Sequence, residues 1–344
     1  MIVMMIVVVV AAEGGARVLG PYLPEPLLYG DEATQVKVQQ LDALGGSCVD
    51  VVVAGNSMGR DAFDPAAFTA ADPQHRRAYN ASLDAASPEL LRRWVLDEVV
   101  PRVHPTTVVI PIASLDLNAN GNATTSALAA YDAAPATQPG WFAGLEGRFI
   151  QHSALLANRR ELRDPQALVD AFDRWRDGAP TDRLSSAGIT GVLGADGQGL
   201  SRRPLHYRGD AGTKAFTRQQ LLSGYTIDPA QVAAVTTLVA QLRAEDIDVV
   251  LTVLPVTDDY IALHPRGRED FDAFLREARS VATHADVPLL DLHDARPGTD
   301  AFADTHHLNE SGATWFSSQL PAQLASQLPA GSGAATLRDR RCPA

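Results

Sequence analysis

Short apolar runs rich in β-branched residues alternate with helical patterns along most of this chain, and no other feature constrains its fold as strongly. The runs at 48–53 and 248–256 ("CVDVVV" and "DVVLTVLPV") carry apolar residues on both alternating faces, as strands buried on both sides of a parallel sheet do. The stretch 87–103 reads as a helix, with Ser87 suited to cap its first turn. Strands and helices in alternation predict an α/β fold with three layers, in which helices cover both faces of a parallel sheet.

The remaining elements and the domain organisation follow from the same pattern. We expect further strands within 75–83, 106–117 and 287–292 and further helices within 34–46, 228–247, 268–285 and 309–328. Residues 119–226 are rich in Ala, Gly, Asp and Arg and break the alternation. We therefore predict one domain over 31–328, with an inserted helical subdomain at about 119–226. A hydrophobic segment and linker over 1–30 precedes it, and a flexible tail over 329–344 follows.

The N-terminal run "MIVMMIVVVVAA" is apolar without interruption over residues 1–12. It is shorter than the roughly 20 residues that a spanning helix needs, and it lacks the positively charged start of a secretory signal. Two interpretations stay open: the end of a membrane anchor that starts upstream, or a buried strand. The Gly- and Pro-rich stretch at 11–26 favours the anchor. An anchor of this kind would leave the protein attached to a membrane.

Composition excludes some classes of partner and site. The net charge of −12 argues against binding to a nucleic-acid backbone, because no basic face is available to displace counterions. Two cysteines, Cys48 and Cys342, are too few for a disulfide-dense scaffold or a cysteine-rich zinc site. Whether these two pair stays open.

Two segments far apart in sequence carry the chemistry. Ser57 lies in G-x-S-x-G directly after an apolar run, in "VVVAGNSMG", and Asp304 and His307 lie in "FADTHHLNESG" near the C-terminus. A serine hydroxyl becomes a useful nucleophile when a histidine accepts its proton and a carboxylate orients that histidine. Ligands of parallel sheets gather at the carboxyl ends of the strands, so we expect these three residues to meet there as a catalytic triad.

Two other interpretations of the same residues are weaker. The G-x-S-x-G pattern is also that of the α/β-hydrolase nucleophile elbow. In that fold, however, the acid comes from an earlier strand loop than the histidine, so a residue such as Asp258 would have to replace Asp304. A metal held by Asp304, His306 and His307 does not meet the ligand number and spacing of known zinc sites. We expect neither a metal nor an organic cofactor.

The segments "GNSM" and D-x-x-H-L-N-x-x-G together resemble the SGNH/GDSL hydrolase superfamily, over residues 48–120 and 228–328. This resemblance implies a flavodoxin-like fold, with Ser57 as nucleophile and Asp304 and His307 on one loop. The chain departs from the family's pattern at three places. Asn56 replaces the usual Asp of the first block, the second block in 79–87 has no glycine, and Leu115 stands where the third block has Asn.

The resemblance also implies where the oxyanion of the reaction is stabilised. Its donors would be the Ser57 amide, a backbone N–H from the loop Asn80–Ala85 and a side chain among Ser114, Asp116 and Asn118. Asn56, Thr257 and Asp258 are candidates for contact with the substrate, and the last two would serve equally well in a helix cap.

The whole pattern looks most like the membrane-anchored, extracytoplasmic branch of the superfamily, with its D-alanyl-transfer and exopolysaccharide O-acetyltransferase-like proteins. That likeness implies a serine esterase or O-acyltransferase that acts on an acylated carbohydrate or cell-envelope glycan, beside a membrane-bound O-acyltransferase as partner. It also implies an extracytoplasmic protein that is membrane-anchored or secreted. A second interpretation is a catalytically inactive, membrane-tethered glycan-binding or scaffold protein with the same fold. The departures in the second and third blocks favour this alternative, and the intact Ser57, Asp304 and His307 count against it.

Overall fold

A computed structural model describes ten segments of the chain: residues 2–23, 28–44, 49–134, 136–137, 153–159, 161–180, 193–194, 196–200, 205–295 and 297–328. Its contacts divide it into two compact units. One comprises residues 1–36 and 130–190, and the other comprises 37–129 and 191–344. The predicted insertion at 119–226 is thus divided, because its flanks belong to the unit that holds the sheet.

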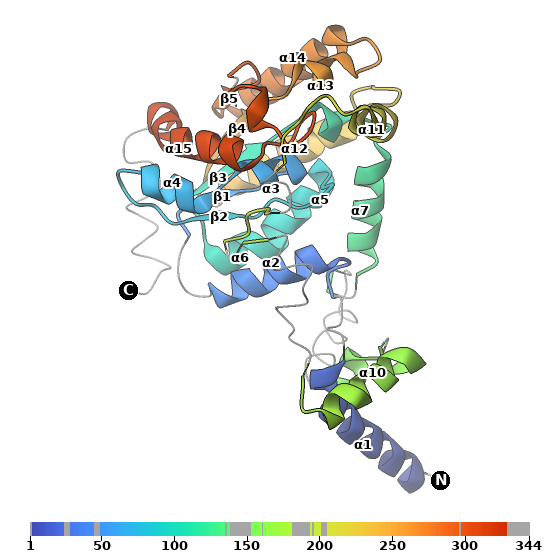
Figure 1. The fold of residues 1–344 in the computed structure, drawn as a ribbon. Coiled ribbons are helices and arrows are strands. Elements are labelled where there is room, and N and C mark those ends of the chain that lie inside the picture. The colour runs from blue at the N-terminus through green and yellow to red at the C-terminus, as the bar shows by residue number, and fades with distance from the viewer. Residues whose placement is uncertain are drawn as a thin grey trace. The chain divides into compact units, whose positions relative to one another are not determined.

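A five-stranded parallel sheet forms the centre of the larger unit (Figure 1). Its strands are β1 (Val51–Val53), β2 (Ala78–Asn80), β3 (Thr107–Pro111), β4 (Asp248–Val253) and β5 (Leu289–Asp291). Their order is β2-β1-β3-β4-β5, which is the flavodoxin-like order of a doubly wound α/β fold. The predicted fold class is therefore confirmed. β1 and β3 are buried along their whole length, as their apolar sequences require.

Two groups of helices cover the sheet. In the first group α15 contacts the other two helices, and in the second α12 does so. The first contains α3 (Ser57–Ala62), α4 (Pro65–Ala71) and α15 (Glu310–Gln327), and the second α5 (Pro88–Arg93), α12 (Pro229–Ala244) and α14 (Arg268–Ala285). Shorter elements are α6 (Val100–Val103), α11 (Ala211–Phe216), α13 (Asp258–Ala262), the π-helical turns Trp94–Val99 and Thr217–Leu221, and the 3₁₀ turns Ser114–Leu117 and Thr299–Ala301.

Capping side chains begin the helices where the sequence predicts. The Ser87 hydroxyl accepts the Leu90 amide at 3.3 Å, and the Asp228 carboxylate accepts the Ala230 amide at 2.8 Å. In both helices a proline occupies the first turn, where its missing N–H costs no hydrogen bond.

The smaller unit is helical in its described part and contains α1 (Ile2–Leu19), the 3₁₀ turns Gly20–Tyr22 and Glu161–Arg163, α9 (Ala154–Ala157) and α10 (Pro165–Arg176). The helices α2 (Glu32–Ala43) and α7 (Asn122–Asp132) cross the division between the units. The interpretation of the run at 1–12 as a buried strand is wrong, because its described residues, 2–12, lie in a helix that continues past Glu13 to Leu19. Cys48 and Cys342, whose pairing the sequence left open, lie outside the described residues.

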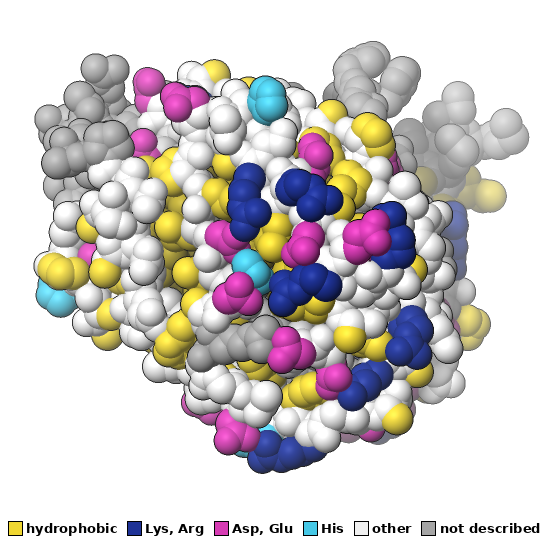
Figure 2. Space-filling view, turned by 90° about the horizontal axis from the view of Figure 1, so that it is seen from above, with side chains coloured by type: hydrophobic (Ala, Val, Ile, Leu, Met, Phe, Trp, Pro, Cys, Tyr) yellow, Lys and Arg dark blue, Asp and Glu magenta, His cyan; other side chains and the backbone are white. Residues whose placement is uncertain are grey.

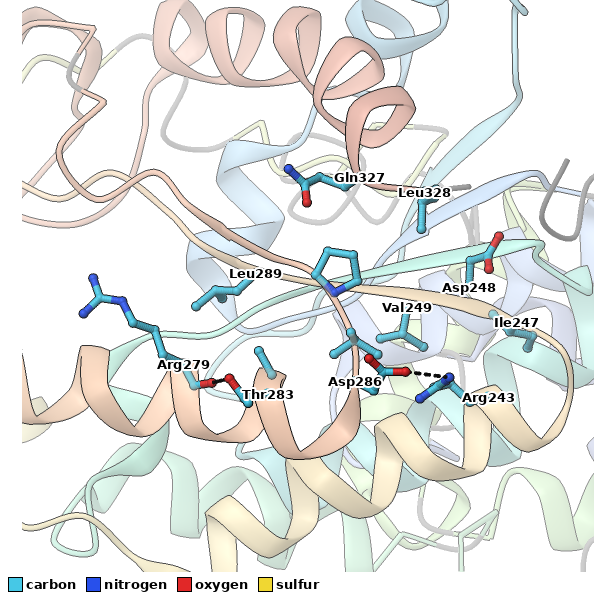
Figure 3. Close-up of a pocket in the computed structure, with 13 residues that line it drawn as sticks. Arg243, Ile247, Asp248, Val249, Arg279, Thr283, Asp286, Leu289, Gln327 and Leu328 are labelled. Carbon is cyan, nitrogen blue, oxygen red and sulfur yellow. Dashed lines mark hydrogen bonds and ion pairs between the residues drawn. The ribbon is translucent and has the colours of Figure 1, made fainter. Parts of the chain in front are cut away.

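The surface of the described residues mixes charges of both signs. Figure 2 shows acidic and basic side chains interspersed among apolar ones on the face seen from above. A pocket of about 650 Å³ lies at the amino ends of β4 and β5, beside the last turns of α12, α14 and α15 (Figure 3). Its two arginines are engaged, Arg243 with Asp286 at 3.7 Å and Arg279 with Asp291 at 2.7 Å. Ser57 follows the carboxyl end of β1, so this pocket lies at the opposite edge of the sheet.

Candidate active site

Ser57 stands at the first turn of α3, immediately beyond the carboxyl end of β1. Asn56 caps this helix, and its Oδ1 accepts the Met58 amide at 2.7 Å. The second glycine of G-x-S-x-G permits a close approach, because a Cβ on Gly59 would lie 2.7 Å from the Ser82 Oγ. The motif therefore packs the turn that carries Ser57 tightly against the neighbouring loop that follows β2.

The structure brings together the three residues predicted as a triad. His307 Nε2 lies 2.8 Å from Ser57 Oγ, and His307 Nδ1 lies 2.8 Å from Asp304 Oδ2. Asp304 and His307 are buried, whereas Ser57 is half-buried. A carboxylate can only accept at Nδ1–H, so the imidazole proton resides on Nδ1 and the lone pair of Nε2 faces the serine hydroxyl. This is the tautomer in which histidine can take a proton from serine.

The loop that carries Asp304 and His307 explains the rest of the D-x-x-H-L-N-x-x-G motif. Leu308 pairs with Phe302 in an antiparallel bridge that closes the loop. Asn309 caps α15, with its Oδ1 accepting the amides of Ser311 at 3.1 Å and of Gly312 at 3.2 Å. A Cβ on Gly312 would lie 2.3 Å from the Ala301 carbonyl oxygen. Each of these motif positions thus holds the loop in the shape that places His307 beside Ser57.

Asp304 also organises its own loop. Its Oδ1 accepts the backbone amides of His306 at 3.0 Å and His307 at 2.9 Å. A second anchor comes from Thr257, whose Oγ1 donates to the Thr305 carbonyl oxygen at 2.7 Å. Thr257 is the N-cap of α13, and Asp258 is the first residue of that helix. Thr257 therefore acts on the site through the loop, a role that the sequence did not indicate.

Asp304, His306 and His307 also form a group whose potential metal-ligating atoms lie within 4.8 Å of one another. In the structure both ring nitrogens of His307 are engaged, with Ser57 and with Asp304. The His306 ring lies against that of His307, with centroids 4.1 Å apart, and its Nδ1 hydrogen bonds with Thr305 Oγ1 at 2.9 Å. This arrangement suits an oriented general base.

Asn80, whose loop was expected to give a backbone donor, and Asn118, a candidate side-chain donor, both make other hydrogen bonds. The Asn80 amide group donates to the carbonyl oxygens of Gly59, Arg60 and Phe63 at 2.8–3.1 Å, and the Asn80 backbone N–H donates to Asp196. The Asn118 amide group donates to the Leu221 carbonyl oxygen at 2.8 Å. Both asparagines therefore hold the backbone around the site.

Ser114 and Asp116, the other two candidates, are buried in the 3₁₀ turn after β3. Ser114 Oγ hydrogen bonds with the Tyr260 hydroxyl and with His264 Nε2, both at 2.8 Å. Asp116 accepts from Asn56. Leu115, where the resemblance to SGNH/GDSL hydrolases led us to look for Asn, is buried and offers no side-chain donor.

The remaining candidates for the oxyanion position are backbone amides of the loop Asn80–Ala85. The amides of Ala81, Ser82 and Leu83 bond to Val53 O, Asn80 Oδ1 and Gly55 O at 2.8–3.1 Å. Within the described part of the chain, the amides of Asp84 and Ala85 have no such acceptor. Ala85 has a φ of +50°, the left-handed conformation that glycine adopts most easily. The loop thus takes a glycine-like shape although the sequence has alanine there, and the Arg60 guanidinium pairs with the Asp84 carboxylate beside it.

Comparison with known proteins gives distant likenesses. No known family and no curated protein matches the chain. An acetyl xylan esterase structure aligns with a TM-score of 0.41 at 11% identity, covering 80% of this chain and 100% of its own. A putative acylhydrolase from Bacteroides fragilis aligns with a TM-score of 0.40 at 12% identity, covering 86% of this chain and 96% of its own. A GDSL-like lipase from Bacteroides thetaiotaomicron aligns with a TM-score of 0.38 at 12% identity, covering 86% of this chain and 99% of its own. Because these likenesses are distant, the chemistry has to be argued from the geometry of the site itself.

Proposed function

We propose that this protein is an SGNH/GDSL-type serine esterase or O-acyltransferase whose catalytic residues are Ser57, His307 and Asp304. The observation that carries the proposal is the continuous series of short contacts from Ser57 Oγ through His307 to Asp304, each of 2.8 Å. A serine, an imidazole in the accepting tautomer and a buried carboxylate in this order form the arrangement that activates a serine for acyl transfer.

The reaction follows from these contacts. Ser57 Oγ attacks the carbonyl carbon of an ester while its proton passes to His307 Nε2, and Asp304 stabilises the imidazolium that forms. Collapse of the tetrahedral intermediate breaks the ester C–O bond, and His307 returns the proton to the leaving alcohol. The acyl group then resides on Ser57. Water or a sugar hydroxyl attacks it, giving its proton to His307, and regenerates the serine.

The oxyanion of the intermediate requires donors near Ser57. We propose the Ser57 amide together with the amides of Asp84 and Ala85, because the other amides of the loop Asn80–Ala85 have acceptors. Backbone donors in a fixed loop cost little reorganisation during the reaction, which is what makes such sites effective.

An acylated carbohydrate or cell-envelope glycan is the substrate class that the sequence resemblance implies, and we propose it on that ground. Whether water or a sugar hydroxyl completes the cycle decides between esterase and transferase. A transferase would work beside a membrane-bound O-acyltransferase.

Membrane association through the N-terminus is part of the proposal, with an extracytoplasmic location. Its support is α1, in which Met4 and the consecutive Val7, Val8, Val9 and Val10 each expose 53–73% of their surface. Four consecutive residues point to all sides of a helix, so a groove on one partner would cover only some of them. None of the described helices combines the length and the apolarity of a membrane span.

Flotation of the full chain with liposomes tests the association. Val8→Asp should abolish it, whereas Val18→Asp, outside the 1–12 run, should not.

The experiment on the triad is hydrolysis of p-nitrophenyl acetate by the wild type, Ser57→Ala and His307→Ala, with Ser318→Ala and His284→Ala as controls. The control residues are an exposed serine and an exposed histidine. We expect loss of activity in the first two variants only. Added glycan acceptors then distinguish transfer from hydrolysis by the appearance of acylated sugar.

A non-catalytic, membrane-tethered glycan-binding or scaffold protein is the second candidate. The buried Leu115 favours it, because it removes the side-chain donor that the third block usually supplies. Absence of turnover and of acyl-enzyme in folded wild-type protein would move the proposal to this alternative.

A further inference from the structure

We propose that Asp116 is a positioning residue for the nucleophile, and that it acts by holding Asn56, the residue directly before Ser57. The inference rests on the proposed function, since it concerns the rate at which Ser57 reacts. The role of the Asn56–Asp116 pair depends on which of their atoms donate hydrogen bonds and which accept them, as well as on how the two side chains pack.

The orientation of the Asn56 amide group is fixed by the backbone. Its Oδ1 accepts the Met58 amide at 2.7 Å, so its NH₂ group must face the other way. There Nδ2 donates to Asp116 Oδ1 at 2.6 Å. Asn56 is 3% exposed, and a buried amide hydrogen without an acceptor would cost about 1–3 kcal/mol. The turn that presents Ser57 therefore depends on an acceptor at position 116.

Asp116 supplies that acceptor from the neighbouring strand. It belongs to the 3₁₀ turn after β3, which pairs with β1 in the sheet. Its Oδ2 accepts the Ala113 amide at 2.8 Å, so both carboxylate oxygens face N–H donors. The hydrogen bond between Asn56 and Asp116 thus joins the carboxyl ends of two adjacent strands, and through them fixes the start of α3.

The surroundings of Asp116 make this bond depend on ionisation. A small cavity beside Asn56 and Asp116 is otherwise lined by apolar side chains, among them Leu91, Ile110 and Leu238. Burial raises the pKa of Asp116 to about 7, against the opposing effect of the hydrogen bonds from Asn56 and Ala113. The titratable groups that interact with its charge are the hydroxyls of Tyr260 and Tyr225, and this charge contributes to raising the pKa of each.

Ionised Asp116 satisfies both N–H donors, whereas its protonated form carries an O–H that competes with them for the same oxygens. We therefore expect protonation of Asp116 to loosen the Ser57 turn and to slow acylation.

Exchange of the two side chains tests the inference. In Asp116→Asn the new NH₂ group faces one of the two N–H donors, the Asn56 side chain or the Ala113 amide. In Asn56→Asp a second carboxylate faces that of Asp116. In the double variant N56D/D116N every donor again meets an acceptor. The carboxylate at position 56 accepts the Met58 amide and the new amide hydrogen, and the amide oxygen at position 116 accepts the Ala113 amide.

We expect each single variant to lower kcat for p-nitrophenyl acetate by about 10- to 100-fold with little change in KM, as loss of one or two well-placed hydrogen bonds does. The double variant should recover to within about fivefold of the wild type, because partners in contact couple strongly. Asn120→Asp, at an exposed loop position, is the matched control and should leave kcat unchanged.

A further variant guards against misfolding of the single exchanges. Asn56→Ser keeps a good N-cap for α3 but gives up the hydrogen bond with Asp116, so it should fold and yet turn over more slowly. Wild-type kcat in Asn56→Ser or Asp116→Asn would overturn the inference, as would a double variant no faster than the singles. An inactive wild type would refute the proposed function instead, and the positioning role would fall with it.

Discussion

Replacement of Asp304 by Asn tests how the base is oriented, because the two side chains have the same shape and differ in what they can donate. Asp304 Oδ1 accepts two backbone amides, at 3.0 and 2.9 Å, and Oδ2 faces His307 Nδ1 at 2.8 Å. In Asp304→Asn the amide oxygen has to remain with the two backbone donors. The new NH₂ group then faces Nδ1 and donates to it.

The consequence is the wrong tautomer of His307. With Nδ1 accepting, the ring proton moves to Nε2 and points at Ser57, so the imidazole cannot take the serine proton. The negative charge that stabilises the imidazolium is lost as well. A change of this kind in a Ser-His-Asp triad costs about 10⁴-fold in rate, or about 5 kcal/mol of transition-state stabilisation.

The assay is kcat/KM for p-nitrophenyl acetate between pH 6 and 9, with the free energy of unfolding measured in urea. Asp300→Asn is the matched control, since Asp300 precedes the same loop and its side chain is exposed. Asp304→Asn should lose about three to four decades in activity while it remains folded. Activity within about tenfold of the wild type, in a folded variant, would refute the reasoning about tautomer control.

Three further predictions concern stability. Ala85→Gly should raise the free energy of unfolding by about 1 kcal/mol in a thermal melt, since it removes the cost of a left-handed alanine at φ +50°; an unchanged or lower melting temperature would contradict this. Gly312→Ala should destabilise the protein by about 2 kcal/mol or more and lower activity, because its Cβ would lie 2.3 Å from the Ala301 carbonyl oxygen. Burial raises the pKa of Asp72, but hydrogen bonds and charge from Arg76 outweigh this and lower it. Asp72→Asn should therefore reduce stability at pH 7, and the difference should fade as the pH drops through the folded-state pKa of Asp72; a difference that does not shrink at all as the pH is lowered would refute this assignment.

The order of strands and helices could be predicted because each element carries its own local signal. Apolar runs on both faces identify the strands, and caps such as Ser87 and Asp228 mark where helices begin. The order of the strands in the sheet is a property of crossover connections and has no local signal. The N-terminal helix extends beyond the predicted break because Gly14 and Gly15 are tolerated within it and Glu13 pairs with Arg17 one turn on.

The meeting of Ser57, Asp304 and His307 could be predicted from sequence because these residues are chemically specific and each lies in a short motif. The oxyanion donors could not, because a donor is defined by the direction in which an N–H group points. Asn80 lies in the loop predicted to give a backbone donor, yet its N–H donates to the Asp196 carbonyl oxygen at 2.9 Å. The glycine-like turn at Ala85 carries no signal in the sequence, since φ is set by the hydrogen bonds of the surrounding loop.

The most direct test of the account is labelling of the folded protein by a fluorophosphonate, with the modified residue located by peptide mass mapping. Ser57 activated by His307 predicts one adduct per chain, on the peptide that contains Ser57. It also predicts no adduct in Ser57→Ala and labelling at least about 100-fold slower in His307→Ala, because the probe reacts only with an activated serine. An adduct on a different serine, or none on folded wild-type protein, would contradict the central claim that Ser57 is a nucleophile.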